Sequence, residues 1–406
     1  MHFNFAWRYF RAKKSANAIN IIAWVTTGVI AFATCCQVLV MSVFNGFEGL
    51  VKSLYSSFYS DIKILPAKGK TFLLPPDLIQ KIKSRPYIQA SSMVAEDKAL
   101  LQNEDAQTVV MMKGVDENYG KVSGVPQKLS SGRFETGTAD DPGLVVGYGI
   151  QNAANIIVDS VYAASEVTIS LPKRNVTDAD PLQSISQGNA KARGVFAIQQ
   201  DFDNNYAITN IDFVKLQMNF AADEYTAMEI KLKDGENVAD ARAGLQQLLP
   251  PGFSVQSRYE QNTSLYNTMR LEKWAIFAVL TLILIIAAFN MVSAVTMLVL
   301  EKKKDISILR SMGGSSRLIQ KIFLSEGLLL GIIGAGIGIS VASIICLLQL
   351  KFHIIKLSGG SFLINYFPVK LLATDFLLVA ATALFIAFLA SWFPSAKAAQ
   401  QPIELK

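Results

Sequence analysis

The residue types that most often carry catalysis or metal binding are scarce in this sequence. Its two histidines, His2 and His353, and its three cysteines form no cluster with metal-ligand spacing. Gly69-Lys70-Thr71 resembles the end of a phosphate-binding loop, but Ile64 stands where that motif requires glycine. We interpret the tripeptide as a solvated turn. The sequence therefore predicts a chain that is not an enzyme, binds no metal or cofactor, and carries no ATPase.

One polar segment, residues 301–321, has a pattern that suits contact with another protein. Ile306, Leu309 and Met312 recur at helical spacing among Lys and Arg residues. Gly313, followed by a second glycine, can end such a helix through a left-handed cap. The segment is interpreted either as an amphipathic helix that fits a groove on a partner or as a solvated positive loop.

Four apolar stretches must position this segment. The sequence is 51% hydrophobic and only 17% charged, and a bilayer core is crossed by about 20 consecutive apolar residues. We expect membrane spans at 19–44, 274–300, 322–350 and 376–396. In the third span, Gly327 and Gly331, then Gly334 and Gly338, follow the small-residue pattern that lets helices approach closely, without indicating which helix packs there.

The distribution of Lys and Arg predicts the orientation of these spans. Residues 1–18 and the segment 301–321 are both basic and should be cytoplasmic. Residues 1–18 are expected to form an amphipathic surface helix, with an extension of the first span as the alternative. The tail 397–406 then lies on the same side, while 45–273 and the short loop 351–375 lie outside. The net charge of +6 is explained by these loops, so we expect no nucleic acid partner.

The outer region, 45–273, has a mixed α/β pattern. Its two ends, 45–105 and 222–273, each show a strand, a helix and a strand, and 106–221 is expected to be a subdomain inserted between them. Residues 173–191 are polar and predict no regular structure, which is typical of a functional loop or of a mobile surface loop.

Several motifs, in this order along the chain, resemble the permeases of the FtsX/MacB superfamily of ABC transporters. They are Glu301-Lys302, Asp305-Ile306, Ile308-Leu309-Arg310, Met312-Gly313, Glu326-Gly327 and the closing stretch from Pro394 to Glu404. The N-terminal motifs Ala6-Trp7-Arg8-Tyr9-Phe10 and Ser42-Val43-Phe44-Asn45-Gly46-Phe47 look most like the lipoprotein-releasing LolC/LolE branch, which usually has Met at the position of Phe44.

The resemblance implies a fold of four transmembrane helices with a large MacB-type periplasmic domain of two subdomains. It also implies a bacterial inner-membrane location, a separate LolD-like ABC ATPase that binds ATP and Mg, and a second permease in a homodimer or heterodimer. The implied coupling residues are Glu301, Lys302, Asp305, Ile306, Ile308, Leu309, Arg310, Met312 and Gly313. Candidates for a hook that recruits a periplasmic lipoprotein chaperone are Lys173, Arg174 and Pro181.

The favoured hypothesis is extraction of lipoproteins from the inner membrane for transfer toward the outer membrane. The first and second spans would line a cavity for the acyl chains, with Val40, Val43, Phe44, Phe47, Phe277, Leu280 and Leu284 as candidate lining residues. One alternative is a permease that transmits ATP-driven movement to a periplasmic hydrolase or efflux partner. A third hypothesis is an inert membrane scaffold.

Overall fold

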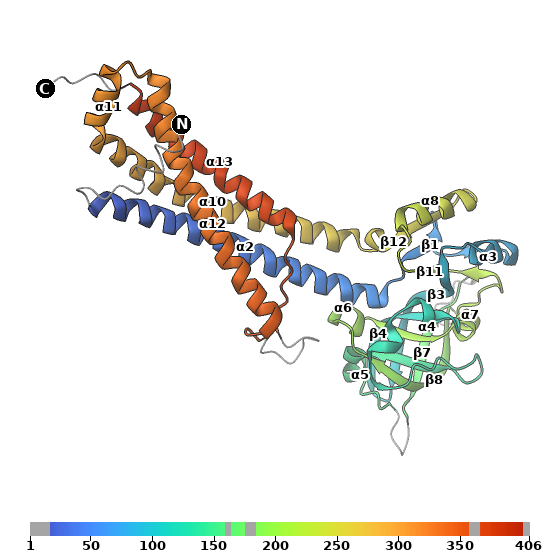
Figure 1. Cartoon of the computed structure of the whole chain (residues 1–406). Helices are drawn as coiled ribbons and strands as arrows, with labels where there is room; N and C mark the ends of the chain where they lie inside the picture. Colours follow the sequence, from blue (N-terminus) through green and yellow to red (C-terminus); the bar gives the residue numbers. More distant parts are fainter. Residues whose placement is uncertain (1–16, 159–163, 175–183, 357–365, 401–406) are drawn as a thin grey trace. The chain divides into compact units, whose positions relative to one another are not determined.

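The computed structural model describes residues 17–158, 164–174, 184–356 and 366–400. The chain divides into two compact units: unit 1 contains residues 1–50 and 267–406, and unit 2 contains residues 51–266 (Figure 1). The expected surface helix at 1–18 and most of the tail 397–406 lie outside the described residues.

Unit 1 is built from long apolar helices. They are α2 (Asn17–Phe58), α10 (Thr263–Glu301), α12 (Ser316–Phe352) and α13 (Ala373–Ala398), with the short α11 (Lys303–Ser311) between α10 and α12. The four long helices are each long and apolar enough to cross a membrane. Three of them extend well beyond the expected spans, because polar turns at their ends continue the same helix.

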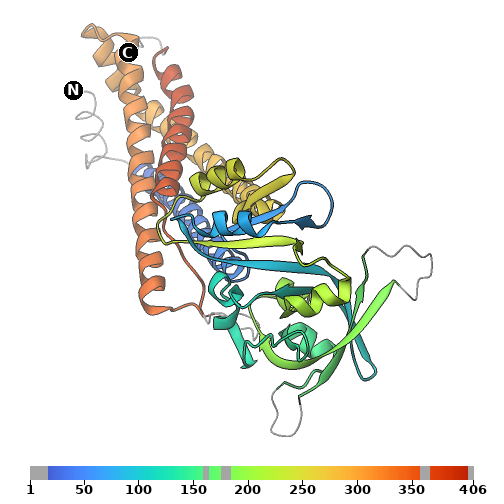
Figure 2. The same cartoon turned by 90° about the vertical axis from the view of Figure 1, so that its right-hand side faces the viewer.

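Small residues determine how α12 packs. A Cβ added at Gly331 would lie 2.5 Å from the Cβ of Ala387 on α13, and one added at Gly338 would lie 2.3 Å from the carbonyl oxygen of Ala31 on α2. The two glycine pairs expected to contact another helix therefore contact two different helices. Figure 2 shows the resulting arrangement of α12 and α13, orange and red, side by side.

Unit 2 contains a ten-stranded mixed sheet with the strand order β12-β1-β11-β3-β4-β9-β6-β8-β5, and β7 pairs with β3 and β8. The strands are β1 (Ile62–Pro66), β3 (Ile88–Asn103), β4 (Ala106–Val115), β5 (Leu129–Gly132), β6 (Gly143–Gly147), β7 (Glu166–Pro172), β8 (Ile185–Phe196), β9 (Tyr206–Asn210), β11 (Ala227–Leu232) and β12 (Phe253–Ser257). A separate two-stranded sheet pairs β2 (Phe72–Leu73) with β10 (Glu224–Tyr225).

Both ends of the outer region contain a strand, a helix and a strand. One set is β1, α3 (Pro76–Lys83) and β3, and the other is β11, α8 (Val238–Leu248) and β12. β1 lies between β11 and β12, so the two sets interleave in one sheet. The remaining strands continue this sheet from β3, which also pairs with β4 and β7.

The other helices of unit 2 are short. They are α4 (Tyr119–Val122), α5 (Tyr148–Ala153), α6 (Gln200–Asp203), α7 (Ile211–Met218) and α9 (Arg258–Gln261), with a 3-10 turn at Val125–Lys128. α7 covers part of β3 and β4, and a Cβ added at Gly114 of β4 would lie 2.8 Å from the Val214 side chain of α7.

The expectation that residues 173–191 lack regular structure is wrong for its second half. β8 begins at Ile185 and pairs with β7 from Pro172 opposite Ile185 to Glu166 opposite Lys191. The polar residues of this strand alternate with the buried Ala190 and Ala192, so half of the strand faces solvent. Pairing with a neighbouring strand, which local composition does not show, is what makes this segment a strand.

A buried ion pair lies in the core of unit 2. Lys113 of β4 is 2% exposed, and its Nζ lies 2.8 Å from Oε1 of Glu229 on β11 and 3.1 Å from the Tyr119 hydroxyl. The ammonium also lies 5.0 Å from the ring centroid of Phe58, which is in the part of α2 that belongs to unit 2. Burial opposes the charge, but attraction to Glu229, Tyr119 and Glu96, with the hydrogen bond to Glu229, together outweighs it and raises the pKa of Lys113.

Candidate functional site

The segment 301–321 contains the expected short helix, α11 (Lys303–Ser311), which ends at the predicted glycine, and its last residues already belong to α12. Gly313 has φ of +87°, a conformation that glycine adopts without a Cβ clash. The Gly314 N–H donates to the Leu309 carbonyl and the Gly313 N–H donates to the Arg310 carbonyl, both at 2.9 Å. These two bonds form a Schellman motif, which turns the chain sharply into α12.

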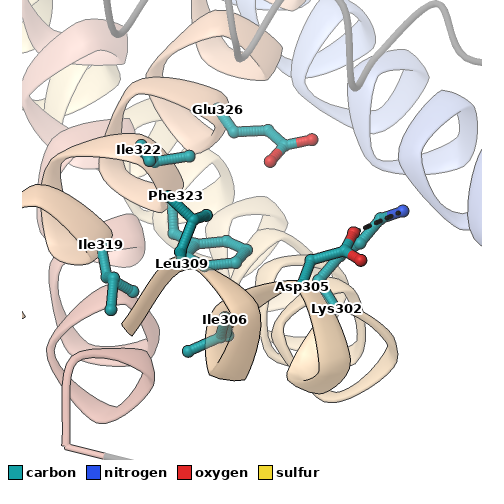
Figure 3. A pocket seen from close by; sticks show the side chains of 8 residues that line it. All are labelled: Lys302, Asp305, Ile306, Leu309, Ile319, Ile322, Phe323 and Glu326. Atoms are coloured by element: carbon teal, nitrogen blue, oxygen red, sulfur yellow. Dashed lines mark ion pairs between the residues drawn. The ribbon is translucent and has the colours of Figure 1, made fainter. Parts of the chain in front are cut away.

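The inner face of α11 packs against the first turns of α12. Ile306 is 3% exposed and lies with Leu309 in a cavity that is also lined by Ile319 and Phe323 of α12. Figure 3 shows these side chains facing one another. The cavity leaves about 10 Å³ of free space, room for about one water molecule. We interpret it as a packed joint between α11 and α12, with too little space for a ligand.

The outer face of α11 is exposed. Ile308 and Met312, four positions apart, are 57% and 81% exposed, and Lys304 and Ser311 lie on the same side. The sequence pattern grouped Met312 with Ile306 and Leu309, and the structure separates them. Met312 directly follows Ser311, the last residue of α11, and stands six positions after Ile306, a spacing that places the two residues on different sides of a helix. The surface available to a partner therefore centres on Ile308 and Met312.

Some charged residues of the segment 301–321 make contacts within the chain, and others are exposed. Lys302 pairs with Asp305 at 3.5 Å, at the rim of the cavity (Figure 3). Glu301, at the end of α10, is exposed. The Arg310 guanidinium donates to the carbonyl oxygen of Ala399, at the end of α13, and to Oγ of Ser316 at 3.3 Å. Arg310 thus ties α11 to α13 within the chain.

One residue of this joint was missed as a site residue. Glu326 of α12 is 3% exposed and lines the same cavity as Ile306, with its carboxylate on the side of the Lys302–Asp305 pair (Figure 3). Burying a carboxylate among apolar side chains is energetically unfavourable, so a residue of this kind is a candidate for a functional role. The available signal was its position, directly before an uncharged stretch.

The residues proposed to line an acyl-chain cavity lie on α2 and α10 with different exposure. Val40 is 40% exposed, whereas Leu284 is 2% exposed and packs in the core of the helix bundle, so it presents no free surface in this arrangement. The others are half-buried: Val43, Phe44, Phe47, Phe277 and Leu280. Phe47 packs edge-to-face on Phe367, with ring centroids 5.8 Å apart.

Three polar residues that were not predicted as a group contact one another. One of them, Asn45, lies between Phe44 and Phe47 in the sequence. The Asn45 amide nitrogen donates to Oδ2 of Asp375 at 2.6 Å, and Nζ of Lys273 donates to Oδ1 of Asn45 at 2.9 Å. Lys273 also lies 3.2 Å from both carboxylate oxygens of Asp375. The signal in the sequence was that Lys273 and Asp375 each directly precede an uncharged stretch, and that Asn45 directly follows the expected span 19–44.

Two of the three hook candidates lie at the base of the β7–β8 hairpin. The Lys173 N–H donates to the Ser184 carbonyl at 2.7 Å, and Arg174 pairs with Asp97 of β3 at 2.6 Å. Pro181 lies outside the described residues. Burial opposes the Asp97 charge, but hydrogen bonds from Arg174 and the Lys98 backbone, with the nearby charge of Lys70, together outweigh it and lower the pKa of Asp97. Arg174 therefore anchors the segment that leads to the candidate hook.

Within the described ranges, no group of three or more His, Cys, Asp or Glu side chains could hold a metal ion. The three cysteines are free and lie in α2 and α12.

Two protein-family models match the chain and together cover most of it. Residues 23–248 match the MacB-like periplasmic core domain, and residues 277–403 match the FtsX-like permease C-terminal region. The chain belongs to the family of membrane permeases that combine these two parts. The expected fold class is therefore confirmed: four membrane helices with a mixed α/β MacB-like domain, in a multi-pass permease of the bacterial inner membrane.

Within this class the chain is similar to lipoprotein-releasing permeases over nearly its whole length. It is 28% identical to the lipoprotein-releasing system transmembrane protein LolC of Neisseria meningitidis, covering 98% of this chain and 96% of LolC. It is 26% identical to LolE of Haemophilus influenzae, covering 99% and 98%. The crystal structure of the periplasmic region of MacB from Actinobacillus actinomycetemcomitans matches with a TM-score of 0.38 at 15% identity, covering 54% of this chain and 98% of that one.

Proposed function

We propose that this chain is a permease subunit of an ABC transporter that extracts lipoproteins from the inner membrane for transfer toward the outer membrane. The observation that carries the proposal is the similarity to LolC and LolE along nearly the full length of all three chains. The partners in this proposal are a separate ABC ATPase, which binds ATP and Mg, a second permease subunit and the lipoprotein itself. A periplasmic lipoprotein chaperone is a further candidate partner.

The strength of membrane anchoring explains why lipoprotein extraction needs an energy source. Each buried CH₂ of an acyl chain contributes about 0.8 kcal/mol to membrane anchoring, so a lipoprotein with several chains does not leave the bilayer spontaneously. Extraction needs ATP hydrolysis and an apolar surface that shields the chains from water. In this proposal Val40, Val43, Phe44, Phe277 and Leu280 supply that surface, on α2 and α10.

The proposed engagement with the ATPase uses the exposed face of α11. We place residues 301–321 on the cytoplasmic side, where the ATPase would contact Ile308 and Met312. Because Ile306 and Leu309 are packed against α12, a push on the outer face would move α11 and the start of α12 as one body. This supports α11 as a coupling helix.

Photocrosslinking tests the lipoprotein-extraction proposal. A photoreactive amino acid at Phe44 should form adducts with a triacylated lipoprotein in membranes, and ATP with the complete complex should reduce the yield. The matched control is the same probe at Ile345, an exposed apolar residue on α12, where no adduct is expected. Equal yields at the two positions would contradict a specific site for acyl chains on α2.

A second candidate function is transmission of movement to a periplasmic hydrolase or efflux partner without extraction of lipid. The observation that favours it is 21% identity to the macrolide export protein MacB of Neisseria gonorrhoeae, over 93% of this chain and 56% of MacB. The crosslinking experiment separates the two functions, because a transmitter has no lipid-anchored protein at Phe44.

A further inference from the structure

The residues Asn45, Lys273 and Asp375 form a closed polar cluster between three helices, in which each side chain contacts the other two. Asn45 belongs to α2, Lys273 to α10 and Asp375 to the first turn of α13. Asn45 is 2% exposed and the Asp375 side chain 12% exposed, while the Lys273 side chain is 24% exposed. We call this cluster the three-helix lock.

The position of the lock makes its contacts strong. Lys273 directly precedes the uncharged stretch 274–300, Asp375 directly precedes 376–396, and Asn45 directly follows the expected span 19–44. All three therefore stand at the same boundary between apolar helix and polar chain. In this setting a side chain that loses its partner has little water to replace it, so separating the lock is unfavourable.

The surrounding backbone is shaped to hold the lock. A Cβ added at Gly46 would lie 2.2 Å from the carbonyl oxygen of Pro368, so only glycine lets the chain before α13 approach α2 here. The Lys370 N–H donates to the Ser42 carbonyl at 2.9 Å. These contacts explain the Ser42–Phe47 motif structurally: it receives the segment that leads into α13.

The opposite end of α13 is tied to α11. The Arg310 guanidinium donates to the Ala399 carbonyl at the end of α13, where a cation also interacts favourably with the helix dipole. Between its two ends α13 packs along α12, where Gly327 and Gly331 allow close contact. α13 is therefore held at one end by the coupling helix and at the other by α2 and α10.

We propose that Asn45, Lys273 and Asp375 are positioning residues for transport: they transmit movement of α11, through α13, to the ends of α2 and α10. This inference rests on the proposed function, because α2 and α10 are the helices assigned to the acyl chains. It predicts that breaking the lock leaves ATP hydrolysis intact but uncouples it from lipoprotein release. A purely structural role predicts that folding, hydrolysis and transport fall together.

The experiment uses the complete complex, purified through a tag on this chain, with Lys273→Met and Asp375→Asn as separate variants. Lipoprotein release should fall about tenfold or more, within the usual range of coupling between distant sites, while ATP hydrolysis by the assembled complex stays near wild type even where the melting temperature falls because a buried partner is lost. The exchanged pair Lys273→Asp with Asp375→Lys should recover part of the release. The matched control is Lys370→Met, which removes an exposed ammonium near the lock, keeps the backbone N–H that bonds to Ser42, and should change none of these readouts.

A second readout does not depend on lipoprotein. Trp274→Cys, beside Lys273 on α10 and 57% exposed, is labelled with a maleimide in a background without the three native cysteines, with and without vanadate-trapped nucleotide. The labelling rate should depend on nucleotide in the wild-type lock and should lose that dependence with Asp375→Asn. A nucleotide-independent rate in the wild-type lock, or an unaltered response in the variant, overturns the inference. A nucleotide-dependent rate without release of lipoprotein overturns the proposed function alone.

Discussion

Ile308 and Met312 are the residues through which contact between α11 and a partner can be tested without disturbing the fold. Both are exposed, whereas Ile306 on the same helix is buried against α12. The two faces of one short helix thus allow binding to be separated from stability by single substitutions.

We expect Ile308→Asp to abolish association with the ATPase, because a charged side chain would replace the centre of the apolar contact. The measurement is co-purification of the ATPase together with the melting temperature of this chain, which should not change. The matched variant Ile306→Asp should destabilise the helix bundle by about 3 kcal/mol or more, since it buries an unpaired carboxylate. Normal co-purification with Ile308→Asp would contradict the assignment of this face.

A second residue-scale prediction concerns Asp97 and Arg174. Because the pKa of Asp97 is lowered in the folded protein from its usual 3.8, this ion pair stabilises the fold above that value and is lost as the pH falls through the lowered pKa. Hydrogen exchange at the Arg174 amide, corrected for its intrinsic rate, should therefore accelerate only in strong acid.

Asp97→Asn should accelerate exchange at the Arg174 amide at neutral pH and remove this acid dependence. The control is Asp141→Asn, which removes a carboxylate that pairs with Lys191 and Arg193 on an exposed surface. Unchanged exchange in Asp97→Asn would show that Arg174 does not anchor the base of the hairpin.

At the scale of the element, α12 carries glycines in two different environments. Gly331 faces Ala387 of α13, while a Cβ added at Gly336 would meet no atom within 4 Å. Gly331→Ala should destabilise the bundle by about 1–3 kcal/mol through overpacking. Gly336→Ala should be neutral or stabilise it by up to about 1 kcal/mol, because alanine favours the helix. Thermal unfolding, followed with a dye that reacts with the native cysteines, measures both changes, and equal shifts would contradict the packing.

The elements also show what local sequence can and cannot predict. The end of α11 at Gly313 and the four apolar helices follow from residue types within a few turns, so they were predicted. The helix that each glycine pair contacts, and the strand that begins at Ile185, depend on neighbours distant in the chain. The three-helix lock is the clearest case, since Asn45 and Asp375 are 330 positions apart in the sequence and no local pattern connects them.

At the scale of the whole molecule, the candidate site is distributed over the chain. The helices α2 and α10 each contribute residues to both units, so the membrane unit and the α/β unit are connected by uninterrupted helices. The near-complete coverage of LolC and LolE includes both units. The sequence alone predicted four membrane-spanning helices, because uncharged runs of about 20 apolar residues are typical of such helices. It did not predict that α2 and α10 continue into the α/β unit. The exposure of individual cavity candidates, such as the buried Leu284, required the structure.

The measurement that tests the central claim most directly is lipoprotein release from proteoliposomes. The complex purified through a tag on this chain is reconstituted with a fluorescent triacylated lipoprotein, and the protein released into solution is measured after addition of ATP and Mg. The account predicts release that requires ATP and is lost with Ile308→Asp. ATP hydrolysis by an intact complex without any release of lipoprotein would contradict it.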